Sequence, residues 1–80
     1  MIAKFSERKL LNDIMREARV LNLHPGTAEF VAKRAIMKAK QWAEGRSMVT
    51  ADDLTRVISK ELAKYNKDLA FVYKQRDKII

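Results

Sequence analysis

The residues best suited to acid–base chemistry are a single histidine and two adjacent aspartates. His24 precedes Pro25-Gly26, and Asp52-Asp53 lies in the second half of the chain. A hydrolytic triad needs a nucleophile, a base and an orienting group, and no serine is marked as a partner of His24. Neighbours on a helix point about 100° apart, so the two carboxylates do not converge on one proton. We therefore expect His24 in a turn, the aspartates at a helix start, and no enzymatic activity.

Ligands for metals and phosphate loops are equally sparse. The chain has no cysteine and one histidine, too few for a zinc site. Its two isolated glycines cannot form a glycine-rich phosphate loop. Trp42 has the chemistry to stack on a base, but its place on an apolar stripe favours core packing. Met15, Met37 and Met48 are likewise expected as core fillers. We predict no catalytic residues, no metal site and no certain cofactor.

Size and composition predict one small globular domain, residues 1–80. Hydrophobic residues make up 48% of the chain and charged residues 34%, a balance typical of folded rather than disordered chains. The absence of cysteine favours a reducing compartment. The chain starts without an apolar signal region, and no apolar run approaches the length of a membrane-spanning helix. We expect a cytoplasmic protein without a membrane partner.

Helical spacing of apolar residues predicts an all-α fold, a small four-helix bundle. Ser6, Thr27, Thr50 and Asn66 are suited to cap the four helices, and Pro25-Gly26 separates the first two. The expected helices cover about residues 6–22, 27–44, 51–65 and 67–79. Their apolar stripes are centred on Leu10, Ile14 and Ala18; on Ala28, Val31, Ala35, Ala39 and Trp42, widened by Phe30; on Leu54, Val57, Ile58 and Leu62; and on Leu69, Val72, Tyr73 and Ile79, with Phe71 adjacent.

The formal net charge of +7 is the strongest indication of a ligand. Such a charge attracts nucleic acid, nucleotides or an acidic partner, and it also serves simple solubility. Five basic residues on and after the second helix are the candidate nucleic-acid contacts: Lys33, Arg34, Lys38, Lys40 and Arg46. Residues 34 and 38 share one face, and 33 and 40 share another. A solvated helix face explains the set equally well.

The order of several motifs resembles the ATP-cone domain, which regulates ribonucleotide reductases and also occurs in the bacterial repressor of reductase genes. Phe5-Ser6-Glu7-Arg8-Lys9-Leu10-Leu11 is similar to the family's Phe-Asp-x-x-Lys-Ile opening. Val49-Thr50-Ala51-Asp52-Asp53-Leu54 resembles its Ile-Thr-x-x-x-Ile helix start. Leu69-Ala70-Phe71-Val72-Tyr73-Lys74-Gln75-Arg76 resembles its terminal Val-Ala-x-x-Tyr-x-x-Tyr-Arg.

This resemblance implies a non-catalytic regulatory or interaction domain that binds ATP or dATP, or else a protein partner. Ser6, Lys9 and Thr50 would be the nucleotide-binding residues, with Lys9 meeting phosphate charge and Thr50 donating a hydrogen bond. Helix N-termini also favour anions on general grounds. The family's N-terminal β-hairpin, with its Lys-Arg-Asp-Gly turn, would precede Phe5. Only four residues stand there, so we expect the hairpin and its phosphate contacts to be lacking.

A second resemblance points to a basic DNA-binding protein, most simply a dimer. Residues 43–54, with the sequence AEGRSMVTADDL, look like the loop and short helix that follow the central helix of the histone fold. That likeness implies that Arg46 contacts DNA phosphate. The expected central helix of eighteen residues, about five turns, is short for a histone. Nucleic-acid binding and a homo-oligomer therefore stay as the alternative expectation.

Overall fold

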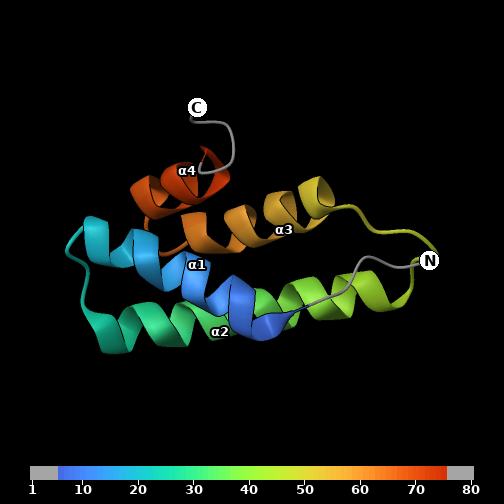
Figure 1. Ribbon diagram of the computed structural model, residues 1–80, viewed down its shortest axis with the longest axis horizontal. Helices are drawn as coiled ribbons and strands as arrows, with labels where there is room; N and C mark the ends of the chain where they lie inside the picture. The colour runs from blue at the N-terminus through green and yellow to red at the C-terminus, as the bar shows by residue number, and fades with distance from the viewer. Residues whose placement is uncertain (1–5, 76–80) are drawn as a thin grey trace.

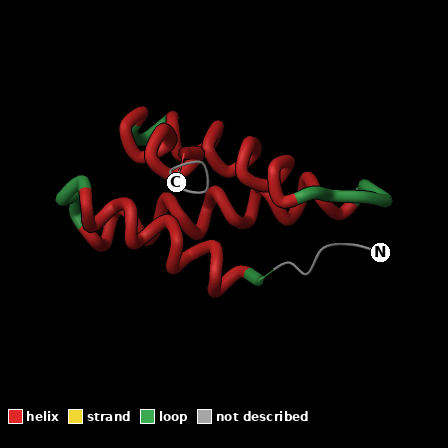
Figure 2. The backbone as a smooth tube through the Cα atoms, turned by 45° about the horizontal axis from the view of Figure 1, so that its top comes forward, coloured by secondary structure: helices red, strands yellow, loops and turns green. Residues whose placement is uncertain are grey.

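The computed structural model describes residues 6–75, which fold into four α-helices and no strand (Figures 1 and 2). These are α1 (Glu7–Val20), α2 (Pro25–Glu44), α3 (Ala51–Ala63) and α4 (Lys67–Gln75). The predicted small all-α four-helix bundle is confirmed. Residues 76–79 of the expected fourth helix, including Ile79, lie outside the described residues. No helix within residues 6–75 is long and apolar enough to cross a bilayer.

Each helix packs against the helices that precede and follow it in the chain, and α1 also packs against α4. The two diagonal pairs, α1 with α3 and α2 with α4, are not in contact within the described residues. Figure 1 shows this ring of neighbours, with α1 crossing in front of α2 and α4 lying beside α3. Short connections impose this order, because they leave consecutive helices no choice but to lie side by side.

Small residues on α2 let its neighbours approach closely. Four alanines of this helix are completely buried at helical spacing: Ala28, Ala32, Ala35 and Ala39. Large side chains from the other helices complete the core around the alanines, and Tyr73 of α4 is the largest side chain that is fully buried. Ile14, Ile58 and Leu69 complete the centre of the same cluster. The interior is therefore built by packing small residues against large ones across the bundle.

Four large apolar residues are exposed, and three of them were expected in the interior: Phe30 on the widened stripe, and Met37 and Met48 as core fillers. Phe30, Met37, Met48 and Phe71 each keep more than half of their surface in solvent. Phe30 and Met37 lie on the outer face of α2, because the alanine face points inward. Trp42 is only half-buried and packs against the edge of the core. Met15 is half-buried against the core, as a core filler should be.

The end of α1 comes two residues before the predicted one. Asn22 adopts the left-handed conformation, with φ of 60°, which asparagine tolerates better than most residues. The Leu23 N–H donates to the carbonyl of Ala18, and the Asn22 N–H donates to that of Arg19, both at 3.0 Å. This is a Schellman arrangement, which closes the helix with asparagine in the usual glycine position.

The start of α2 was predicted at Thr27, and that prediction is wrong. His24 is the N-cap, and its Nδ1 accepts a hydrogen bond from the Thr27 N–H at 3.2 Å. Pro25 occupies the first helical position, where its missing N–H costs nothing and its fixed φ suits the helix. Pro25 therefore begins α2, whereas Asn22 closes α1, and the lone histidine has a capping role.

Polar caps begin α3 and α4, and a short turn joins the two helices. At the start of α3, Thr50 and Asp53 form a reciprocal capping box. Three residues, Lys64 to Asn66, connect α3 to α4, and the Asn66 side chain accepts a hydrogen bond from the Leu69 N–H at 2.9 Å. The short turn aligns the outer faces of the two helices, and the most basic groove described below forms between them.

Candidate anion-binding groove

A basic groove of about 420 Å³ runs between α3 and α4. Its lining consists of three residues of α3 and four of α4: Arg56, Ser59 and Lys60, and Lys67, Ala70, Phe71 and Lys74. Four of the seven are cationic and none is acidic. We call this feature the α3–α4 groove.

Helical periodicity explains why these side chains share one groove. Arg56 and Lys60 are four residues apart on α3, so they lie one turn apart on the same face. Lys67, Phe71 and Lys74 are spaced by four and three residues on α4 and share a face for the same reason. Lys67 and Lys74 are separated by about 10 Å along the helix axis. The groove thus carries a cationic stripe on each wall.

Among residues 6–75, no carboxylate neutralises the lysines of the α3–α4 groove. Lys60, Lys67 and Lys74 make no ion pair with any carboxylate in residues 6–75. Arg56 is the exception, because its Nη2 lies 2.6 Å from Oδ1 of Asp53. Unpaired cations in one place raise the local positive potential and repel one another, and a bound anion relieves that repulsion.

The floor of the groove contains a buried hydroxyl. Ser59 and Ala70 are both 8% exposed, beneath the cations of the two walls. The Oγ of Ser59 has no hydrogen-bond partner within the described residues. A buried donor without an acceptor destabilises the fold. Among the residues that line the groove, Ser59 is therefore the one whose buried polar atom has no hydrogen-bond partner in the described residues.

Two other grooves of similar size are electrostatically mixed. The first, about 400 Å³, lies between α2 and α3 and includes Arg34, Lys64 and Glu61. The second, about 380 Å³, lies between α1 and α2, where Lys40 and Glu7 pair across it at 3.3 Å. Each therefore has a carboxylate in its lining, where it would repel an anion. The α3–α4 groove is the better anion site of the three.

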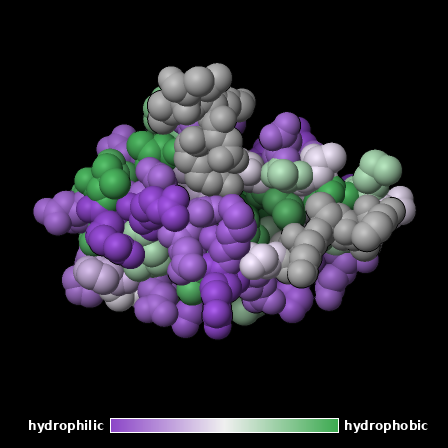
Figure 3. All heavy atoms as spheres, in the orientation of Figure 1, coloured by the Kyte–Doolittle hydropathy of each residue, from purple (hydrophilic) through white to green (hydrophobic). Residues whose placement is uncertain are grey.

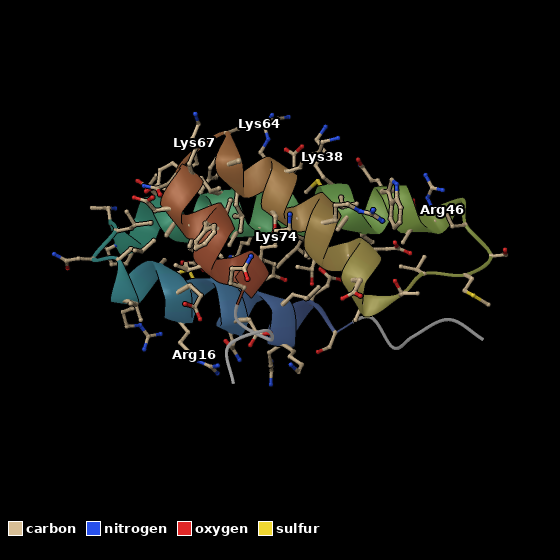
Figure 4. All side chains as sticks on the ribbon, turned by 90° about the horizontal axis from the view of Figure 1, so that it is seen from above. Arg16, Lys38, Arg46, Lys64, Lys67 and Lys74 are labelled. Atoms are coloured by element: carbon tan, nitrogen blue, oxygen red, sulfur yellow. The ribbon has the colours of Figure 1, made fainter. Side chains whose placement is uncertain are left out.

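Basic side chains continue from the α3–α4 groove around the turn between these helices. Figure 4 shows Lys67 beside Lys64, with Lys38 of α2 along the same edge of the molecule. Lys64 is paired with Glu61 at 3.0 Å, whereas Lys38 makes no ion pair in the described part of the chain. On the face seen in Figure 3, hydrophilic residues dominate and apolar ones form scattered patches. The labelled lysines in Figure 4 thus continue the basic surface of the α3–α4 groove toward Lys38.

The three residues implied by the ATP-cone resemblance have local partners. Ser6 caps α1, and its hydroxyl accepts from the Lys9 N–H at 3.3 Å. The ammonium of Lys9 lies 3.5 Å from Asp13. Thr50 accepts from the Asp53 N–H at 3.1 Å. Because α1 and α3 are not in contact, the structure does not gather these three side chains, and none of them lines the three grooves described above.

The five residues predicted to contact nucleic acid also lie on different faces of the molecule. Lys33 and Lys40 border the groove between α1 and α2, and each is paired with a glutamate. Arg34 borders the groove on the other side of α2. Arg46 stacks on the ring of Trp42. Only part of the set, Arg34 and Lys38, lies toward the edge that continues from the α3–α4 groove, so α2 does not present these cations as one surface.

Sequence reasoning missed the α3–α4 groove. The sequence does show that Arg56 and Lys60 share one face of their helix and that Lys67 and Lys74 share one face of theirs. Nothing in either pattern indicates that the two stripes face a common groove, because that depends on how the helices pack. The place of Phe71 in the groove was not predictable for the same reason, since its position beside the apolar stripe is compatible with either burial or exposure.

No cluster of three or more histidine, aspartate or glutamate side chains suited to a metal ion occurs in residues 6–75. Comparisons with protein-family models, with curated protein sequences and with solved structures found no match to this chain. The inference of function consequently depends on the groove and on the charges around it.

Proposed function

We propose that this chain is a non-catalytic domain that binds nucleic acid through the phosphate backbone, with the α3–α4 groove as the contact surface. One observation carries the proposal: Lys60, Lys67 and Lys74 surround a groove that has no carboxylate in its lining and form no ion pair in the described residues. The formal net charge of +7 supports it.

A polyanion fits the groove better than a small anion does. The cations stand on two helices, and those of α4 are about 10 Å apart along its axis. One carboxylate or phosphate cannot reach all of them, whereas successive phosphates of a strand can. Binding would then be driven largely by release of the counterions around the phosphates, which makes affinity depend steeply on salt.

The test is the salt dependence of binding, measured by fluorescence anisotropy with a labelled oligonucleotide supplied as a single strand and as a duplex. We expect affinity to fall steeply between about 50 and 200 mM salt for at least one of the two. Combining Lys60→Gln, Lys67→Gln and Lys74→Gln should lower the slope of log affinity against log salt by about 2, because each lost phosphate contact removes roughly 0.7 for a single strand.

A control variant of equal net charge distinguishes binding at the α3–α4 groove from non-specific attraction by the overall positive charge. Lys9→Gln, Lys33→Gln and Lys40→Gln together lower the formal net charge from +7 to +4, as the groove variant does, because both remove three positive charges. Those lysines are ion-paired and lie outside the α3–α4 groove. Equal loss of affinity in the two variants would reject the groove as the site, and no binding by the unmodified chain would reject the function.

The nucleotide-binding and regulatory role implied by the ATP-cone resemblance stays a separate prediction. It rests on Ser6, Lys9 and Thr50, whose side chains already have partners in the fold. Titration of the chain with fluorescently labelled ATP and dATP tests it directly, because these residues lie outside the α3–α4 groove: binding that Lys9→Ala abolishes would support the nucleotide site. A cytoplasmic location, a protein partner and self-association likewise stay predictions. The prediction of a cytoplasmic location rests on the lack of cysteine in the sequence.

A further inference from the structure

The exposed aromatic ring in the α3–α4 groove indicates what form of nucleic acid binds there. Phe71 is 64% exposed, although a phenylalanine of α4 could have been buried against the neighbouring helix. We infer that the groove takes single-stranded nucleic acid, with one base stacked on the Phe71 ring and the flanking phosphates on the lysines. This inference rests on the proposed function and narrows it to a class of ligand.

The spacing on α4 matches such a strand. Lys67 precedes Phe71 by four residues and Lys74 follows it by three, so the ring lies between two ammonium groups on one helix face. Across the groove, Arg56 and Lys60 of α3 provide the second cationic wall. Sites that bind single strands without sequence preference combine the same two elements, a positive groove that follows the backbone and an aromatic ring for a base.

A duplex can use the ring in this way only if one of its base steps is first unstacked, which costs free energy that a single strand does not spend. In an intact duplex the bases are stacked on one another and present only their edges in the grooves, so a base face is not available to an aromatic side chain. Phenylalanine has no hydrogen-bonding group with which to contact an edge. On duplex DNA the ring would contribute little, and only the cations would bind. The aromatic residue therefore discriminates between the two forms through its lack of polar atoms.

The same chemistry predicts weak sequence preference. Every base has a face that can stack, and a ring without donors or acceptors cannot distinguish one base edge from another. Single-stranded DNA and RNA share this chemistry and differ in the 2′-hydroxyl. Oligonucleotides of deoxyuridine and of uridine, compared at equal length, differ only in this hydroxyl and determine whether the groove prefers DNA or RNA.

The deciding variant is Phe71→Ala, with Phe30→Ala as its control. The two rings have nearly the same exposure, 64% and 66%, but Phe30 lies in the mixed groove that contains Glu61. We expect Phe71→Ala to weaken single-strand binding by about 5- to 150-fold, the range seen when one stacked base is lost. The salt slope should not change, because no phosphate contact is removed. Phe30→Ala should leave the affinity nearly unaltered.

A second variant gives a readout other than affinity. Phe71→Trp keeps an aromatic ring in the groove and adds a fluorophore. Affinity for the single strand should be retained, and the added emission should be quenched on titration with the oligonucleotide. Because Trp42 also emits, the unmodified chain serves as the reference for the background signal.

The outcomes separate this inference from the proposed function. If the duplex binds as tightly as the single strand and Phe71→Ala behaves like Phe30→Ala, the stacking inference is overturned. The groove-lysine variant would still lose affinity in that case, and the proposed function would stand. If neither nucleic acid binds the unmodified chain, both fall together. Tighter binding of the single strand, lost specifically in Phe71→Ala and retained in Phe71→Trp, is the result that supports it.

Discussion

The guanidinium carbon of Arg46 lies 4.2 Å from the centroid of the Trp42 ring. Arg46 follows the end of α2, and Trp42 stands at the edge of the core in the last turn of that helix. This is a cation–π contact, and it covers one face of a tryptophan that packs incompletely into the core. The histone-fold resemblance implied that Arg46 contacts DNA phosphate, but in the structure Arg46 already contacts the Trp42 ring.

Replacing Arg46 with glutamine should reduce stability modestly. We expect the free energy of unfolding to fall by about 0.5–1 kcal/mol, the usual magnitude for an exposed cation–π contact. Urea unfolding followed by Trp42 fluorescence measures both the stability and the environment of the ring. Arg34→Gln removes the same charge from α2 without a ring contact and should change the stability by less. Equal losses in the two variants would show that the contact contributes nothing.

Removing the Thr50 hydroxyl should destabilise the start of α3. The hydroxyl accepts from the Asp53 N–H at 3.1 Å, and a cap of this kind contributes about 1 kcal/mol. We expect Thr50→Ala to lower the free energy of unfolding by that amount, measured by urea titration and circular dichroism. Thr50→Ser keeps the acceptor oxygen and should restore most of the loss. A serine variant as unstable as the alanine variant would contradict the capping explanation.

The same capping box predicts a pH dependence at Asp53. The Thr50 N–H bonded to its carboxylate, followed by the Thr50 side chain and the charge of Arg56, lowers the pKa of Asp53 below its ordinary value. Because the folded pKa is below the unfolded one, the stabilisation is complete above about pH 4 and is lost as the pH falls through the folded pKa.

The experiment compares the unfolding midpoint of Asp53→Asn with that of the unmodified chain at several pH values. The difference between the two should be greatest near neutral pH and should shrink below about pH 4. Asp52→Asn removes the same charge from the same turn but leaves both hydrogen bonds of the capping box in place, and its difference should be smaller. A constant difference for Asp53→Asn at all pH values would exclude ionisation as the source.

Removing the buried hydroxyl of Ser59 should stabilise the protein. Its Oγ has no hydrogen-bond partner in the described residues, and alanine is also the better helix former. We expect Ser59→Ala to raise the free energy of unfolding by about 1 kcal/mol, since a buried unsatisfied polar group is lost. Thermal and urea unfolding measure this directly. A clear loss of stability would mean that the hydroxyl makes a contact on which the fold depends.

Two neighbouring residues of α2 should respond very differently to truncation. Ile36 is 3% exposed and Met37 is 59% exposed. Ile36→Ala should lower the free energy of unfolding by about 2–5 kcal/mol, because it opens a cavity in the core. Met37→Ala should change it by about 0.5 kcal/mol or less. Similar effects at the two positions, in urea unfolding, would contradict the orientation of α2.

Much of the local structure could be predicted from the sequence, because it depends on residues close together in the chain. Ser6, Thr50 and Asn66 cap their helices as expected, since each cap bonds to a backbone N–H three residues later. Apolar spacing correctly predicted Ile14, Ile58 and Leu69 in the interior. His24 was the local exception, because histidine is an uncommon cap and Thr27 is a better one by type.

Only the tertiary structure decided the candidate site. The cationic stripe of α3, with Arg56 and Lys60, meets that of α4, with Lys67 and Lys74, because the turn from Lys64 to Asn66 sets the two helices side by side. Packing also decided that Phe71 stays outside while Tyr73 is buried. Helical periodicity assigns each residue to a face of its own helix, but which faces come together depends on how the side chains of all four helices pack into one core, a property of the whole bundle.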